Sequence, residues 1–243
     1  MGNNLKGSRA LVFGGTSGIG LASAQALAAA GAEVGVAGST AANLDSALKA
    51  LPLGTRGFTV NAADTTAIAT ALADFGAFDH LVVCVGGGSA IGPYRDLTEE
   101  KMRAGFDNKF WHYQRITRAA LAGLRGAGSI TWVTGAAARL AIRGMAGLAA
   151  TNGALHAMVG PLALELAPIR VNAVSPGFID TPYWRKVMPA AACEKLYADM
   201  AAVVPVKRVG APEDVGNAVA MVVGNGFFTG AILDCDGGRH LGA

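Results

Sequence analysis

Charged residues are scarce in this sequence, and the two signs nearly balance. Asp, Glu, Lys and Arg make up only 15% of the 243 residues, and the formal net charge at pH 7 is +3. The basic residues are scattered and form no dense run. Because a protein that binds nucleic acid through its phosphates needs a concentrated basic surface, we expect no nucleic-acid partner.

Long apolar runs are also missing, although 52% of the residues are hydrophobic. No uninterrupted run reaches the roughly 18 residues that a membrane-spanning helix requires. The segment from Met1 to Lys6 lacks the apolar core of a signal peptide, and Lys6 stands where a myristoylation motif has Ser or Thr. We therefore expect no membrane partner.

Cysteine is rare as well. The three cysteines, Cys84, Cys193 and Cys235, are odd in number and widely spaced. Such a pattern indicates neither a disulfide framework nor a set of metal ligands. Since free thiols are typical of a reducing compartment, we expect a cytoplasmic protein without a metal site.

Short apolar segments alternate along the chain with longer, alanine-rich segments. We expect strands at residues 9–13, 33–37, 57–60, 80–85, 129–133, 169–174 and 231–235, and helices at residues 18–30, 43–51, 65–75, 98–124, 147–167, 189–203 and 212–223. Strands that alternate with helices form a parallel sheet with helices on both faces. Without a linker or a break in composition, this pattern predicts one α/β domain over residues 1–243. We expect a Rossmann-type, doubly wound, mainly parallel sheet of seven strands.

A glycine-rich turn separates the first expected strand from the first expected helix. Glycine adopts positive φ at little cost and lets the backbone approach a ligand closely. The N-terminus of a helix presents free N–H groups and a partial positive charge to a phosphate. The pattern predicts a pyrophosphate site, with contacts from Gly14, Thr16, Ser17, Gly18, Ile19 and Gly20.

Three motifs in a fixed order connect this turn with a known family. They are Gly14-x-x-x-Gly18-Ile19-Gly20, Asn172-Ala173-Val174-Ser175-Pro176-Gly177 and Asp236-Gly237-Gly238. With them the sequence resembles the short-chain dehydrogenase/reductase family from Lys6 to Gly238. The resemblance implies an NAD or NADP cofactor and hydride transfer between a carbonyl and an alcohol. It also implies a small-molecule substrate, which the sequence does not identify, and a homo-oligomer, either a dimer or a tetramer.

The residues that the family uses for this chemistry are mostly missing. The resemblance implies a Tyr that transfers the proton, a Lys four residues later, a Ser thirteen residues before the Tyr, and an Asn on the long helix. No Tyr-x-x-x-Lys occurs in the sequence, and alignment from Leu164-Glu165-Leu166 places Leu148, Asn152 and Gly135 at the three positions. Leucine and glycine cannot transfer a proton. Asn108 alone is kept, and we predict it as a catalytic residue.

The cofactor contacts implied by the resemblance are better preserved. Asn152 can still bond ribose hydroxyls, without the charge of a lysine. Ser39 stands at the position that reads the ribose, and Asn61 replaces an Asp beside the adenine. Because no acidic residue repels a 2′-phosphate there, the sequence slightly favours NADP over NAD, and it leaves weak binding open. The other family contacts are Gly86, Pro176, Gly177 and Thr181.

Some polar side chains near the expected site have two interpretations. Tyr94 and Tyr183 lie in loops after expected strands and join Gly135 and Leu148 as candidates for the substrate pocket. His156, one turn beyond Asn152, is a candidate for the lost acid, and His112 is another, although packed histidines are more common.

Other side chains are expected to be structural. Lys109 follows Asn108 by about 100° around the helix, so we expect a solvated charge. Cys84 on an apolar strand is expected to pack. Arg139 and Arg143 follow the fifth strand, where they would meet an acidic substrate or remain at the surface. Pro161 is expected to kink its helix.

Three functions remain open on the sequence alone. The favoured prediction is a divergent NAD(P)-binding protein of oxidoreductase ancestry, whose ordinary Tyr–Lys chemistry is lost or reassigned. The first alternative is an active NAD(P)H-dependent carbonyl reductase or alcohol dehydrogenase that uses another proton donor. The second is a non-redox enzyme or a regulatory binding protein on the same scaffold.

Overall fold

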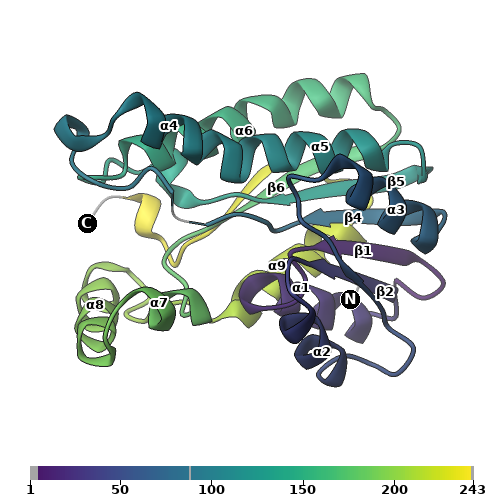
Figure 1. Cartoon of the computed structure of the whole chain (residues 1–243), viewed down its shortest axis with the longest axis horizontal. Coiled ribbons are helices and arrows are strands. Elements are labelled where there is room, and N and C mark those ends of the chain that lie inside the picture. Colours follow the sequence, from purple (N-terminus) through teal and green to yellow (C-terminus); the bar gives the residue numbers. More distant parts are fainter. Residues whose placement is uncertain (1–4, 88, 242–243) are drawn as a thin grey trace.

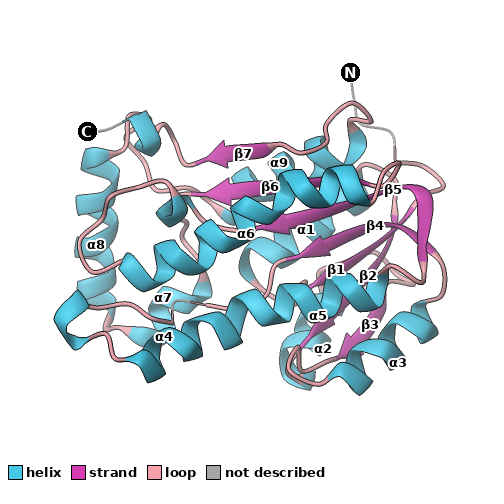
Figure 2. Cartoon of the chain, turned by 90° about the horizontal axis from the view of Figure 1, so that it is seen from above, coloured by secondary structure: helices cyan, strands magenta, loops and turns pink. Residues whose placement is uncertain are grey.

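The computed structural model describes residues 5–87 and 89–241, and it contains a seven-stranded sheet between two layers of helices (Figures 1 and 2). The strand order is β3-β2-β1-β4-β5-β6-β7, and every neighbouring pair is parallel. This confirms the predicted doubly wound α/β fold. The expectation that residues 1–6 form neither a signal peptide nor a myristoylation motif concerns a segment whose residues 1–4 lie outside the described residues. The strands are β1 (Arg9–Phe13), β2 (Glu33–Gly38), β3 (Arg56–Thr59), β4 (Phe78–Val83), β5 (Leu124–Val133), β6 (Arg170–Pro176) and β7 (Ile232–Cys235).

The helices cover the two faces of the sheet in separate groups (Figure 1). One face is covered by α3 (Thr65–Phe75), α5 (Trp111–Ala120) and α6 (Ala146–Glu165), and the other by α1 (Gly18–Ala29), α2 (Ala41–Lys49) and α9 (Pro212–Gly224). A short helix, α7 (Pro182–Val187), and a longer one, α8 (Ala190–Val203), lie beyond the carboxyl ends of β6 and β7 (Figure 2). The sequence placed residues 182–187 in a loop, so α7 is a correction.

The long helix expected at residues 98–124 is interrupted. It consists of α4 (Glu99–Gly105), a π turn η2 (Phe106–Phe110) and α5, and β5 already begins at Leu124. Thr98 caps α4, because its hydroxyl accepts a hydrogen bond from the Lys101 N–H at 3.3 Å. A π turn has i→i+5 hydrogen bonds and therefore changes which side chains face the sheet.

The buried strands hold the carboxyl edge of the sheet rigid. Fully buried side chains of β1 and β4 pack on both faces, with Leu11 and Leu81 toward α3 and α5 and with Val12 and Val82 toward α1 and α9. Each such side chain contributes about 1.5–3 kcal/mol relative to exposure. The loops that follow these strands therefore start from fixed positions, which is the usual place for a ligand site in this type of fold.

Candidate functional site

The turn between β1 and α1 requires its glycines. Gly14 has φ +80°, and a Cβ added to it would overlap the Cys84 carbonyl after β4. A Cβ at Gly20 would overlap the Gly14 carbonyl, so α1 begins directly against the turn. Gly18 has φ +51°, and an added Cβ would lie 3.5 Å from the Cβ of Thr181. The turn therefore meets the loop after β6, as the predicted cofactor contacts require.

The N-terminus of α1 is open to an anion. Its N-cap residue, Ser17, is extended and makes no side-chain capping bond, and the first turn carries no acidic residue. Thr16 is buried with its side chain above Gly38, at the end of β2. Ile19 packs partly against the core beneath α1. Free N–H groups at the start of a twelve-residue helix suit a pyrophosphate.

The positions expected to read the adenosine lie at the ends of β2 and β3. Ser39 is exposed and uncharged, and the neighbouring Thr40 caps α2 by accepting the Asn43 N–H at 3.4 Å. Asn61 is exposed, and its side-chain oxygen accepts the Ala63 N–H at 3.0 Å. Neither Ser39 nor Asn61 repels a phosphate.

The family asparagine position on the long helix differs from the expectation. The Asn108 side chain is exposed and donates to the Ser89 hydroxyl at 3.2 Å. Its backbone carbonyl packs against Gly86, which has φ +85°. The catalytic role of Asn108 therefore stays a prediction, and the inward-facing side chain at this point is the next one, Lys109.

The expectation that Lys109 is a solvated charge is wrong. The residue is only 8% exposed, and its Nζ donates to the Thr134 carbonyl at 3.0 Å, at the end of β5. Lys109 precedes the buried Tyr113 by four residues, so it lies on the helix face that also buries Ile116, and Asn108 turns outward. The ammonium also lies 5.6 Å from the centre of the Tyr113 ring.

Burial sets the proton affinity of Lys109 and of the thiol beside it. Desolvation lowers the pKa of Lys109 to about 8, although the nearby Cys84 opposes the shift. Desolvation raises the pKa of Cys84 to about 11, despite the favourable charge of Lys109. At neutral pH the pair is therefore an ammonium and a neutral thiol, which agrees with a packing role for Cys84.

The structure brings together the three positions where the family has Ser, Tyr and Lys. A Cβ added to Gly135 would lie 3.3 Å from Asn152 Oδ1, and Asn152 Nδ2 donates to the Leu148 carbonyl at 2.9 Å. Asn152 is 1% exposed, and among the described residues its Oδ1 has no hydrogen-bond partner. A buried acceptor without a partner indicates that a ligand or water bonds it.

His156 is tied to the same strand end. Its Nε2 lies 2.8 Å from Thr134 Oγ1, which also donates to the Val174 carbonyl at 3.2 Å. Because the hydroxyl has one proton, His156 Nε2 acts as the donor in this arrangement. Its pKa is lowered chiefly by desolvation, opposed by Asp234 and reinforced by Arg139. His156 therefore supports Thr134.

The two candidate tyrosines have different positions. Tyr94 lies in a short 3-10 turn (Tyr94–Asp96) and is 78% exposed. Tyr183 in α7 lies next to the loop after β4, with Cε2 3.7 Å from a Cβ added to Gly87. Tyr183 thus borders the site. Arg139 forms an ion pair with Asp234.

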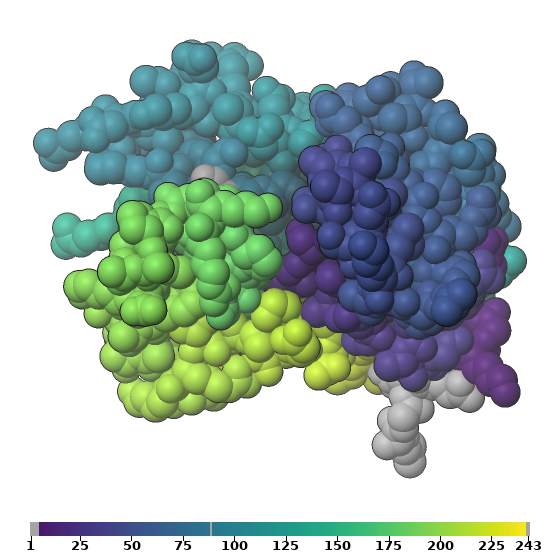
Figure 3. All heavy atoms as spheres, turned by 60° about the horizontal axis from the view of Figure 1, so that its bottom comes forward, coloured from purple at the N-terminus to yellow at the C-terminus, as the bar shows by residue number. Residues whose placement is uncertain are grey.

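The loop after β6 completes the site. A Cβ at Gly177 would lie 2.7 Å from the Asp236 Cα, which holds Pro176 and Gly177 close to the end of β7. Thr181 precedes α7 and faces Gly18. In the space-filling view the surface is indented between the green α7–α8 segment and the purple N-terminal part (Figure 3).

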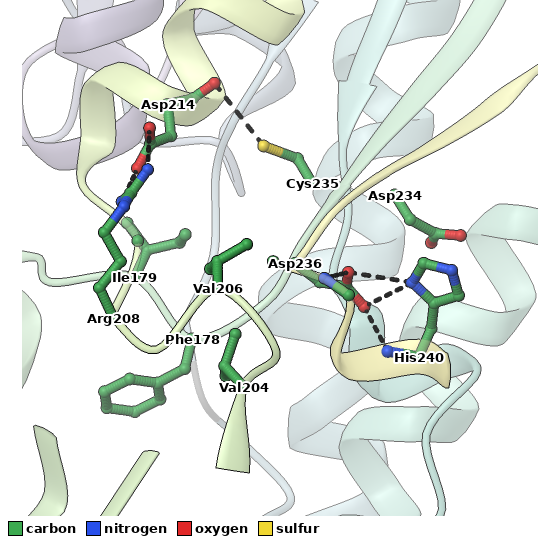
Figure 4. A pocket seen from close by; sticks show the side chains of 13 residues that line it. Phe178, Ile179, Val204, Val206, Arg208, Asp214, Asp234, Cys235, Asp236 and His240 are labelled. Atoms are coloured by element: carbon green, nitrogen blue, oxygen red, sulfur yellow. Dashed lines mark hydrogen bonds and ion pairs between the residues drawn. The ribbon is translucent and has the colours of Figure 1, made fainter. Parts of the chain in front are cut away.

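A cavity of about 300 Å³ at the ends of β6 and β7 was not predicted (Figure 4). The Arg208–Asp214 ion pair lies on one side, and the contact between Asp236 and His240 lies on the other. The Asp236-Gly237-Gly238 motif was the one sequence signal near it. Within residues 5–87 and 89–241 no group of three or more His, Cys, Asp and Glu side chains is placed to hold a metal ion. In the same part of the chain no helix is long and apolar enough to cross a membrane.

Comparisons with known proteins agree with this geometry. A family model described as enoyl-(acyl carrier protein) reductase matches residues 14–240. The chain is 32% identical to the short-chain dehydrogenase/reductase ATR9 of Stachybotrys chlorohalonatus, over 98% of each chain. It is also 32% identical to L-xylulose reductase of Cavia porcellus, over 96% of this chain and 97% of the relative. A solved small-chain dehydrogenase in complex with NADPH is 32% identical, with a TM-score of 0.84 over 97% of this chain and 99% of that one.

Proposed function

The chain belongs to the short-chain dehydrogenase/reductase family of oxidoreductases, and from this premise we propose that it binds NADP(H) at the carboxyl edge of its sheet. We include in the proposal that the Ser–Tyr–Lys chemistry of the family is lost or reassigned in this chain. The glycine turn with its open α1 N-terminus carries the first part. The residues Gly135, Leu148 and Asn152, which stand where the family has Ser, Tyr and Lys, carry the second.

The geometry fits a dinucleotide at two separate points. The turn requires glycine at positions 14, 18 and 20, where a Cβ would collide with the protein or strain the backbone, and it leads directly into the uncapped N-terminus of α1. At the second point, on α6, the buried Asn152 Oδ1 accepts no hydrogen bond from any described residue. A ribose hydroxyl can donate to it. When bound, the nicotinamide supplies hydride.

The preference for NADP over NAD rests on charge. The end of β2 presents Ser39, and the first turn of α2 contains no acidic residue. A 2′-phosphate there meets the N-terminal end of a helix, which favours an anion. The NADPH complex of a 32% identical relative supports the same preference.

One observation favours the alternative function, an active reductase with another proton donor. Lys109 bonds the Thr134 carbonyl at the end of β5, and its pKa of about 8 suits proton transfer near neutral pH. Neither Gly135 nor Leu148 can donate a proton. In this alternative, the Lys109 ammonium protonates the oxygen of a reduced carbonyl.

Titration with NADPH and with NADH tests the proposed function. Cofactor fluorescence measures the two affinities, and we expect NADPH to be the tighter ligand. We expect Gly20→Val to abolish binding, because the valine side chain would overlap the Gly14 carbonyl. Gly153→Ala is the matched control, because an added Cβ there meets nothing within 4 Å. Failure of both nucleotides to bind below about millimolar concentration would contradict the proposal.

An activity assay separates the two functions. A panel of L-xylulose, simple ketones and aldehydes follows from the names of the relatives. Turnover by the wild type that disappears in Lys109→Met, with NADPH still bound, supports the active reductase. Binding without turnover of any substrate supports a protein that has lost the ordinary chemistry.

The remaining parts of the proposal concern the whole protein. We keep a single domain over residues 1–243, a cytoplasmic location and a homo-oligomer as proposals. Light scattering of the purified chain checks the last, with a dimer or tetramer expected and a monomer as the contradicting result. The catalytic role of Asn108 is checked by Asn108→Ala, which should lower turnover without changing NADPH affinity.

A further inference from the structure

Two buried polar groups of opposite hydrogen-bonding type lie at the end of β5. The Lys109 ammonium has three N–H donors, and its described partners are the Thr134 carbonyl and the face of the Tyr113 ring. Asn152 Oδ1 is an acceptor without a described partner. Both residues are more than nine-tenths buried, at 8% and 1% exposed.

The two groups converge on one peptide unit from different helices. Lys109 comes from the π turn η2 and bonds the carbonyl of Thr134, whereas Asn152 comes from α6 and lies beside the Cα of Gly135. Position 135 carries no side chain, and a Cβ added there would lie 3.3 Å from Asn152 Oδ1. Gly86, at the end of β4, packs directly on Lys109.

Such a pair matches a sugar with two adjacent hydroxyls. One hydroxyl can accept from the ammonium, and the other can donate to the amide oxygen, which satisfies both groups at once. A side chain that only donates a structural hydrogen bond to the Thr134 carbonyl does not need a positive charge, since desolvating an ammonium is costly. The charge therefore points to a ligand that accepts from it.

We infer that Lys109 and Asn152 hold the nicotinamide-side ribose together, with the cation supplied by η2 and the amide by α6. The cation thus comes from the long helix at Lys109, whereas the family resemblance implies a lysine at position 152. This rests on the proposed function, because it requires a bound dinucleotide.

An exchange of side chains tests the inference. NADPH affinity is measured by fluorescence for the wild type, Lys109→Met, Lys109→Asn and the double variant Lys109→Asn/Asn152→Lys. We expect either single substitution at 109 to weaken NADPH about 10- to 100-fold, the range for a hydrogen bond to a charged group. The double variant should recover to within about threefold of the wild type, because it restores one cation and one amide.

The adenosine half of the cofactor serves as the internal control. Affinity for 2′,5′-ADP, which lacks the nicotinamide ribose, should change less than about twofold in every variant. This also shows that each variant is folded. Lys101→Met is the matched control, because Lys101 donates to the Asp96 carbonyl at 3.0 Å from an exposed position.

The outcomes separate the inference from the proposed function. If the wild type binds neither NADPH nor NADH, the proposed function is wrong and the inference with it. If the wild type binds NADPH and Lys109→Met binds it equally well, only the inference is wrong. An equal loss of 2′,5′-ADP affinity, or a double variant no better than Lys109→Asn, would likewise overturn the inference.

Discussion

Replacement of Lys109 by methionine removes a buried ammonium while it keeps an unbranched side chain. Burial lowers the pKa of Lys109 from 10.5 to about 8. One pKa unit corresponds to about 1.4 kcal/mol, so near pH 7 the buried charged form costs the folded state about 3 kcal/mol relative to the neutral amine. Between these two pKa values the unfolded chain binds more protons than the folded chain. The contribution of Lys109 to the free energy of unfolding of the wild type therefore rises with pH.

Urea unfolding at about pH 7 and about pH 9.5 measures this effect. We expect the wild-type stability, relative to Lys109→Met, to rise by about 2 kcal/mol between the two pH values. Cys84, with its pKa of about 11, is common to both proteins and cancels in the difference. Lys101→Met is the control for loss of a lysine that bonds a backbone carbonyl at an exposed position. Parallel pH profiles for the wild type and Lys109→Met would refute the electrostatic reasoning.

Two further predictions concern other buried groups. Because burial raises the pKa of Cys84 to about 11, its thiol should react with iodoacetamide near pH 8 far more slowly than in urea, and equal rates would contradict the burial. Asp236→Ala should lower the free energy of unfolding by about 2–4 kcal/mol, since the carboxylate accepts the Gly238 and His240 N–H groups at 3.0 and 2.8 Å. Asp199→Ala, at an exposed ion pair, is the control, and an equal loss there would speak against a structural role of Asp236.

The fold follows from local patterns that the sequence displays directly. Apolar segments such as Leu11 to Phe13 become buried parallel strands, and glycine turns mark the points where strands end. The first half of β5 was missed because residues 124–128 have the composition of a loop. It pairs with β4 through a register shift between Phe78 and His80. Such a contact depends on the partner strand and leaves no pattern in its own segment.

The sequence analysis found the site residues whose positions follow from counting along the chain. It missed the site residue whose role depends on which face of its helix is buried. Counting back from Leu164-Glu165-Leu166 predicted that Asn152 and Gly135 belong to one site, and the structure places Asn152 beside Gly135. The facing of Lys109 was missed because the family asparagine was matched to Asn108, which set the inward face one residue too early. The spacing of four residues between Lys109 and the buried Tyr113 was the signal that places Lys109 inward.

The position of the cation determines how ordinary chemistry can be restored to this scaffold. Gly135→Ser, Leu148→Tyr and Asn152→Lys together supply the side chains that the family uses, but the new lysine would enter a buried site that already contains the Lys109 ammonium. Two neighbouring cations lower the pKa of one of them and disfavour the charged form that must stabilise a tyrosinate. We therefore expect the triple variant to reduce simple ketones slowly, and the same variant with Lys109→Asn to be at least about tenfold faster at saturating NADPH. Equal rates would mean that Lys109 and position 152 do not share one electrostatic site.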